Sequence, residues 1–104
     1  MTKEERLTLY ADAEKHWGTL AQYDQCIEEM GELLVAINKF KRHNFFNEEF
    51  DYDVKDNLLE ELADVYMCIE QLIQMNGEKE VFEVLDKKLL KMKGQLEKFK
   101  NRNK

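Results

Sequence analysis

Two pairs of carboxylates have a spacing that suits metal binding. Glu29 and Glu32 are three residues apart, and so are Glu61 and Asp64. Residues three apart in a helix stand on one face, one turn from each other. Four carboxylates that converge inside a helical protein repel one another and require a cation or protons. An all-oxygen set of this kind suits Mg²⁺, or Mn²⁺, rather than zinc or copper.

The surroundings of the two pairs favour an inward position. The first pair lies within the apolar stretch 27–37 and the second within the apolar stretch 58–73. The alternative is that each pair belongs to a solvated helix face with lysine partners, because acidic residues three apart are common in helices. A di-iron bundle is excluded, since it needs Glu-x-x-His motifs and neither His16 nor His43 has a Glu three residues before it.

The elements that must position these groups are predicted to be helices. The chain has no proline and only four glycines, and it is rich in straight-chain helix formers. Periodicity of 3.6 residues predicts an all-α bundle of about four helices. The expected helices cover residues 2–15, residues 19–42, a segment between Asp53 and the Asn76-Gly77 stop, and residues 81–99.

Capping patterns predict where two of these helices begin. The Thr19 to Gln22 segment has a capping-box pattern, and Asp53 is a candidate N-cap for the third helix. Residues 43–53 are expected to form a loop of about ten residues.

Each of the last three helices has an apolar side that should face a partner helix. The second carries Leu20, Tyr23, Ile27, Met30, Leu34, Ile37 and Phe40; the third carries Leu58, Leu62, Val65, Tyr66, Ile69 and Ile73. In the fourth, Val81, Leu85, Leu89, Met92, Leu96 and Phe99 form a seam suited to a partner helix within the subunit or across a dimer.

Length and charge limit the classes of function. At 104 residues we expect one domain, 1–104, with a thin core that association between copies would support. The net charge of −6 argues against nucleic acid or an anionic membrane as the main partner. Cys26 and Cys68 belong to no metal or disulfide pattern, and no long apolar run is present, so we expect reduced thiols and a cytoplasmic protein.

Three segments resemble a known family. They are EEMGEL at 28–33, AINK at 36–39 and EELADV at 60–65. Together they are similar to the MazG-like, all-α nucleoside triphosphate pyrophosphohydrolases, whose signature is ExxE followed after a spacer by ExxD. The spacer here is 28 residues, 33–60, at the long end of the family's usual spacing. Trp17-Gly18, Gln22, Lys39 and Arg42 also resemble small members, and the resemblance covers roughly residues 16–75.

The resemblance implies a specific chemistry. Family members cleave (d)NTP to (d)NMP and pyrophosphate, often to remove unwanted nucleotides, and related proteins are homodimers or homotetramers. By this match Glu29, Glu32, Glu61 and Asp64 are the Mg²⁺ ligands and catalytic residues. One carboxylate would also act as general base, and Glu28 or Glu60 would assist from outside the ligand set.

Four further residues are candidates for nucleotide binding. Lys39 lies two turns beyond Glu32 on the same face and can reach a phosphate; Arg42 is a second candidate. Asn57 lies one turn before the second acidic pair and can bind phosphate or sugar, and Trp17 can stack on a base. The alternatives are ordinary roles: helix-end cations that answer the macrodipole, an exposed first-turn residue, and an aromatic ring that closes the bundle.

Two rival functions remain open at this point. The first is a non-catalytic helical module that binds nucleotide or metal without turnover. The second is a plain oligomerisation bundle, in which the acidic pairs are solvated and the fourth helix's seam is the functional surface.

Overall fold

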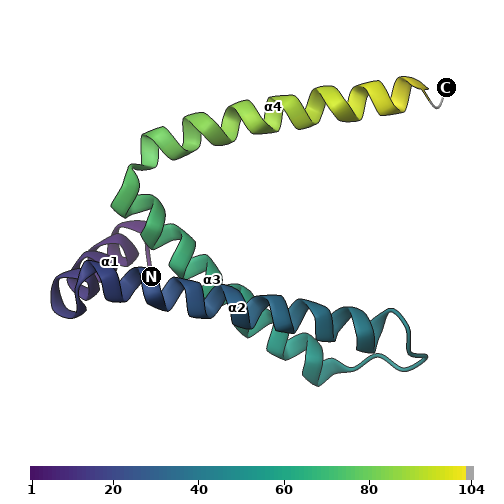
Figure 1. Cartoon of the computed structure of the whole chain (residues 1–104), viewed down its shortest axis with the longest axis horizontal. Coiled ribbons are helices and arrows are strands. Elements are labelled where there is room, and N and C mark those ends of the chain that lie inside the picture. Colours follow the sequence, from purple (N-terminus) through teal and green to yellow (C-terminus); the bar gives the residue numbers. More distant parts are fainter. Residues whose placement is uncertain (103–104) are drawn as a thin grey trace. The chain divides into compact units, whose positions relative to one another are not determined.

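All regular structure in the part of the chain that the structure describes is helical. The computed structural model describes residues 1–102. It contains four helices (Figure 1): α1, Lys3–Trp17; α2, Thr19–Asn44; α3, Tyr52–Asn76; and α4, Glu78–Arg102. The expectation of an all-α chain with about four helices is therefore confirmed.

Two of the three connections between helices are single glycines. Gly18 lies between α1 and α2 with φ of 95°, and Gly77 lies between α3 and α4 with φ of 114°. Positive φ is accessible to glycine at little cost because it has no Cβ. The Gly18 amide donates to the Glu14 carbonyl at 2.8 Å, and the Gly77 amide donates to the Ile73 carbonyl at 2.9 Å. The predicted helix stop at Asn76-Gly77 is therefore confirmed.

The two predicted N-caps are wrong. The N-cap of α2 is Gly18, which has no side chain to accept a hydrogen bond, so Thr19 makes no capping box. The capping box instead starts α1, where Thr2 and Glu5 bond reciprocally. At the start of α3, Asp51 rather than Asp53 accepts the Val54 amide on its side chain, at 3.1 Å.

The chain divides into two compact units, residues 1–72 and 73–104. In the first unit, α2 and α3 run antiparallel (Figure 1). Three contacts between the two helices establish this direction. Gln71 bonds to Gln22, and the Cys26 thiol donates to the Cys68 carbonyl at 3.6 Å. Glu32, which follows Cys26 on α2, lies near Glu61, which precedes Cys68 on α3. The connection covers residues 45–51, shorter than the predicted loop because α2 continues to Asn44.

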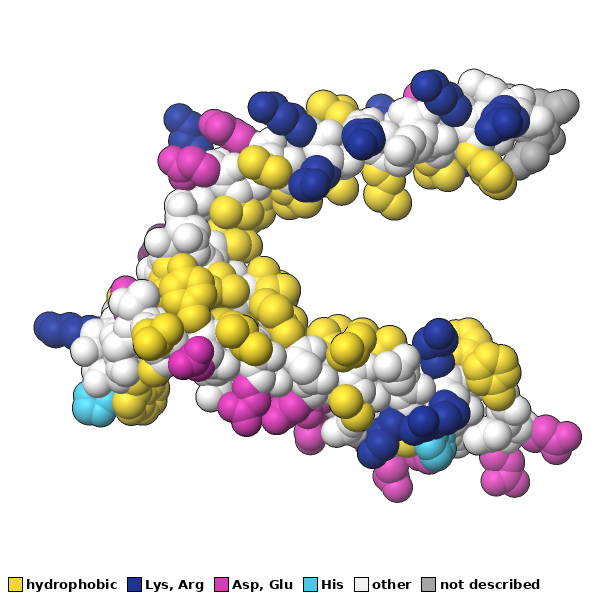
Figure 2. Space-filling view, viewed as in Figure 1, with side chains coloured by type: hydrophobic (Ala, Val, Ile, Leu, Met, Phe, Trp, Pro, Cys, Tyr) yellow, Lys and Arg dark blue, Asp and Glu magenta, His cyan; other side chains and the backbone are white. Residues whose placement is uncertain are grey.

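The pairing face of α2 and α3 coincides with the apolar stripes that periodicity predicts only at Val65. The buried residues are Gln22, Cys26 and Ala36 on α2, and Val65, Cys68 and Gln71 on α3. The stripe residues Ile27 and Leu34 are instead 69% and 63% exposed. Most of these side chains are small or polar and allow the two helices to approach closely. Beside this face Glu29, Glu61 and Asp64 are half-buried, whereas Glu32 is exposed. Most of the other stripe residues are also exposed, and hydrophobic side chains gather along one side of the hairpin (Figure 2).

A polar cluster attaches α1 to α3. The Arg6 guanidinium donates to both carboxylate oxygens of Glu70, at 2.7 and 3.0 Å, and the Tyr10 hydroxyl donates to Glu70 at 2.8 Å. Bidentate pairs of this kind are stronger than single surface ion pairs. The hydrogen bonds from Arg6 and Tyr10 hold the pKa of Glu70 at about 2, and burial raises the pKa of Tyr10 to about 12.

This cluster predicts acid sensitivity. Because the folded pKa of Glu70 lies below its unfolded value near 4.5, its contribution is present above pH 4.5 and is lost as pH falls toward 2. We expect Glu70→Gln to lower the melting temperature at neutral pH and to flatten its decline between pH 4.5 and 2. Thermal melts followed by circular dichroism measure this, with Glu4→Gln, an exposed α1 carboxylate, as control. Equal acid sensitivity of wild type and Glu70→Gln would contradict the assignment.

In the second unit, α4 presents an apolar seam with lysines on its other sides (Figure 2). The seam residues Leu85, Leu89, Met92, Leu96 and Phe99 are all exposed. No helix among the described residues is long and apolar enough to cross a membrane.

Candidate metal and nucleotide site

Three of the four predicted metal ligands meet between α2 and α3. Glu29, Glu32 and Glu61 each offer a carboxylate oxygen, and these oxygens lie within 4.8 Å of one another. Glu29 and Glu61 are half-buried and Glu32 is exposed. The antiparallel register of the hairpin creates the cluster, because it sets the first acidic pair opposite the second. Because Glu32 is exposed, one side of the cluster remains open to a ligand from solution.

The fourth residue, Asp64, lies beside this triad rather than within it. Its charge acts on Glu29, and both residues line one cavity. The pKa of Glu29 is raised, first by burial, then by the neighbouring charge of Glu32 and, more weakly, by that of Asp64. A hydrogen bond of 2.7 Å from the Gln25 amide opposes this rise. The site therefore has an excess of negative charge that a cation would relieve.

Two oxygens in the cluster lack any partner. Oε2 of Glu29 and Oε2 of Glu61 are buried and have no hydrogen-bond donor among the described residues. A buried acceptor without a partner costs about 1–3 kcal/mol, and more when it is charged. A hard divalent cation satisfies such oxygens directly, and Mg²⁺ is commonly held by one or two carboxylates with waters and substrate phosphates. The residues present therefore fit a Mg²⁺ or Mn²⁺ ion.

Two cavities adjoin the carboxylates. The first, which we name the Trp17 cavity, has a volume of about 330 Å³. Its lining is mainly apolar and includes Trp17 from the end of α1, as well as Glu29 and Asp64. The indole is largely exposed and lies edge-on to His16, with 5.3 Å between ring centroids. The structure therefore brings Trp17 to the same cavity as two of the predicted ligands.

The second cavity, which we name the Lys39 cavity, has a volume of about 380 Å³. Lys39 of α2 and Asn57 of α3 line it together with Glu32 and Glu61. The small residues Gly31 and Ala36 leave the space open; they belong to the same lining. A cation and an amide thus stand in one cavity with two of the carboxylates, an arrangement that could bind phosphate oxygens beside a metal ion.

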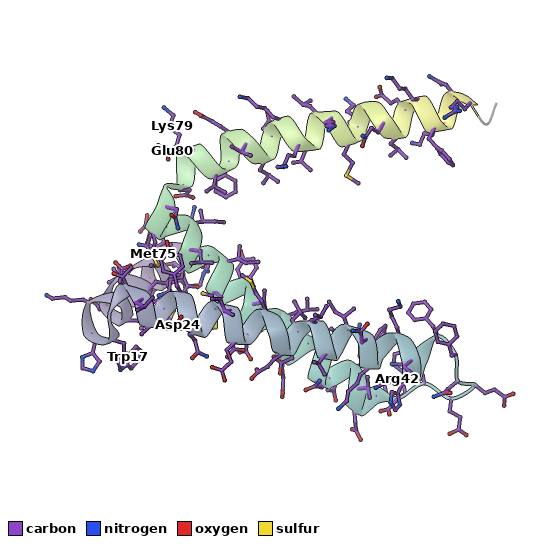
Figure 3. All side chains as sticks on the ribbon, viewed as in Figure 1. Trp17, Asp24, Arg42, Met75, Lys79 and Glu80 are labelled. Atoms are coloured by element: carbon purple, nitrogen blue, oxygen red, sulfur yellow. The ribbon has the colours of Figure 1, made fainter. Side chains whose placement is uncertain are left out.

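The remaining candidates are placed differently. Arg42 is exposed in the last turn of α2 and does not line the Lys39 cavity; Figure 3 shows it at the opposite end of α2 from Trp17. Glu28 lines the Lys39 cavity, whereas Glu60 is exposed and lines neither cavity. The structure therefore groups Lys39, Asn57 and Glu28 with the carboxylates and leaves Arg42 apart.

Sequence reasoning missed several residues of this region. Tyr10 and Met67 line the Trp17 cavity, and Arg6 fixes α1 through Glu70. No local pattern marks the contacts of Arg6 and Tyr10 with Glu70, because they join residues 64 and 60 positions apart. Gln71 did carry a signal, since it lies on the same face of α3 as Glu61 and Asp64.

Comparison of the chain with family models, with curated proteins and with solved structures found no match.

Proposed function

We propose that this protein is a Mg²⁺-dependent nucleotide pyrophosphohydrolase of the MazG-like type, which cleaves (d)NTP to (d)NMP and pyrophosphate. The observation that carries the proposal is the pair of unpartnered, buried oxygens of Glu29 and Glu61 within a carboxylate cluster. The MazG-like sequence segments supply the reaction class, and the two adjoining cavities supply space for a nucleotide.

The proposed metal ligands are Glu29, Glu32, Glu61 and Asp64. A bound Mg²⁺ would neutralise phosphate oxygens and lower the pKa of a bound water. The chain's own groups then have distinct tasks. A carboxylate of the cluster that is not engaged with metal accepts the proton of the attacking water.

Lys39 and Asn57 are the proposed phosphate contacts. The Lys39 ammonium offsets charge on the leaving pyrophosphate, and the Asn57 amide donates to a phosphate oxygen. Both line the cavity that contains Glu32 and Glu61. We propose no phosphate role for Arg42, because it does not line this cavity.

The proposed role of Lys39 predicts a kinetic effect without a metal effect. We expect Lys39→Ala to lower kcat/KM for nucleoside triphosphates about tenfold or more, since hydrogen bonds to charged groups are worth about 1.5–3 kcal/mol. Stabilisation by Mg²⁺ should persist, because Lys39 does not bind the cation. Steady-state assays of Lys39→Ala and of Lys41→Ala, an exposed neighbour on α2, measure the difference. Equal kcat/KM in both variants would indicate that Lys39 is an ordinary cation near the end of the helix, without a phosphate role.

We also propose that copies of the chain associate as a homodimer or homotetramer. The exposed apolar stripes of α2 and α3 and the exposed seam of α4 support this, because contiguous apolar surface is characteristic of interaction sites.

The function itself is tested by product analysis. Purified protein with Mg²⁺ is incubated with a panel of canonical and modified NTPs and dNTPs, and the products are separated by ion-exchange chromatography. We expect monophosphate and pyrophosphate in equal amounts from at least one substrate. Diphosphate and inorganic phosphate as products would contradict the reaction class. No turnover of any substrate would favour a non-catalytic module that binds nucleotide or metal.

A further inference from the structure

The Trp17 cavity contains two polar side chains that are almost completely buried. Gln22 and Gln71 are 9% and 7% exposed, and they are the buried polar residues among residues 1–102. Leu9, Ala13 and Met67 contribute apolar atoms to the same lining. Two amides enclosed in an apolar cavity need hydrogen-bond partners, because burial removes water from them.

The amides satisfy each other only in part. Gln71 Nε2 donates to Gln22 Oε1 at 2.7 Å. A primary amide has two N–H donors and a carbonyl acceptor, so this bond leaves Gln22 Nε2 and Gln71 Oε1 without a partner among the described hydrogen bonds. Both residues line the cavity. A donor and an acceptor are thus available side by side to an occupant of the cavity.

The rest of the cavity restricts what that occupant can be. The lining is mainly apolar, and Trp17 offers an exposed aromatic face on which planar rings stack. Glu29 and Asp64 line the same cavity, so the occupant lies next to the carboxylate cluster. A planar heterocycle with one acceptor and one donor on its edge, linked to a group that reaches the metal ligands, meets each condition.

We propose that Gln22 and Gln71 are the specificity-determining residues for the nucleobase. Gln22 Nε2 donates to an acceptor on the base edge, Gln71 Oε1 accepts from the adjacent donor, and Trp17 stacks on the ring. The bond between the two glutamines couples their orientations, so that one amide offers a donor and the other an acceptor. The pair therefore favours a base edge with one acceptor and one donor over an edge with two donors or two acceptors. The proposal rests on the proposed function for the class of ligand, but base binding itself requires neither metal nor hydrolysis.

The test uses nucleosides, which carry no phosphate and need no metal. Trp17 is the chain's one tryptophan, so its fluorescence reports occupancy of the cavity. The full chain is titrated without divalent ions with uridine, thymidine, cytidine, adenosine, guanosine and, as reference, ribose, and absorption by the ligand is corrected with N-acetyltryptophanamide. We expect saturable quenching by at least one nucleoside, with an apparent Kd at least about tenfold lower than that of ribose.

Gln22→Met and Gln71→Met separate recognition from packing, because methionine retains the length and apolar contacts of glutamine. We expect each to weaken the preferred nucleoside about tenfold, as loss of one buried hydrogen bond implies, while Gln95→Met on the exposed part of α4 leaves it unchanged. Thermal melts establish that each variant is folded. Unchanged affinity and preference in both folded variants, or no saturable quenching of wild type by any nucleoside, would overturn the proposal. If the protein binds a nucleoside through the two glutamines but hydrolyses no nucleotide, this proposal stands and the proposed function is contradicted. If it hydrolyses a nucleotide with a base preference that neither substitution changes, the proposed function stands and this proposal is overturned.

Discussion

Asp64→Asn should reduce Mg²⁺-dependent turnover by at least about a hundredfold. The substitution retains the shape of the side chain but removes a negative charge beside Glu29, whose pKa responds to that charge. Changes to groups that merely orient metal ligands already cost about 10–100-fold, so loss of a ligand should cost more. Initial rates at saturating Mg²⁺ measure the effect on whichever nucleotide the product analysis selects.

Asp24→Asn is the matched control for this prediction. Asp24 is an exposed carboxylate on α2 that lines neither cavity (Figure 3). The same change of charge there should leave the rate unaltered, and melting curves should show that both variants are folded. If Asp64→Asn turned over nucleotide as fast as Asp24→Asn, Asp64 would not belong to the catalytic carboxylates.

Ile27→Glu or Leu34→Glu should dissociate the oligomer into monomers. Both side chains lie on the α2 stripe and are largely exposed within one copy of the chain. If the stripe is the interface, each substitution places a charge in desolvated apolar surroundings, which is strongly unfavourable. Size-exclusion chromatography with multi-angle light scattering, run over a range of concentrations, gives the mass of each species.

The control for the interface is Asn47→Glu, which adds the same charge at an exposed polar position of the α2–α3 connection. It should retain the mass of the wild type. A wild-type chain that is monomeric at all concentrations would show that the stripe is not an interface between copies. An oligomer that survives both stripe substitutions would move the interface elsewhere, for example to the α4 seam.

Helix content was predictable from sequence because it depends on local properties. The absence of proline, the periodic apolar residues and the Asn76-Gly77 stop act within a few residues of one another. Cap positions were less predictable. Thr19 and Thr2 are both followed by suitable partners, and only the extended backbone at Thr2 makes its hydroxyl available to the helix amides.

The pairing face was the principal error, and it has a physical cause. Periodicity identifies an apolar stripe but does not specify which surface covers it. Here α2 and α3 meet through Cys26, Ala36 and Cys68, whose small side chains permit close approach. Of the predicted stripe residues only Val65 is buried, and most of the larger ones are exposed. The same choice of face leaves Glu29, Glu61 and Asp64 half-buried and Glu32 exposed.

The candidate site was partly predictable because helical spacing is a local property of the sequence. Glu29 and Glu32, or Glu61 and Asp64, share a face by helical spacing alone, and the hairpin register brings three of the four together. The Trp17 cavity was not predictable, because it requires α1 to be fixed against α3 by Arg6 and Glu70. Contacts over such a separation depend on tertiary structure and leave no short motif.

The central claim is that the carboxylates between α2 and α3 hold a divalent cation, and melting temperature as a function of Mg²⁺ concentration tests it most directly. A cation that binds only the folded chain at ten times its Kd stabilises it by about 1.4 kcal/mol, which corresponds to several degrees in a domain of this size. We predict that wild type and Glu60→Gln, altered at an exposed neighbour, show this rise and that Glu61→Gln does not. A rise in Glu61→Gln equal to that of wild type, or none in wild type, would contradict the metal site.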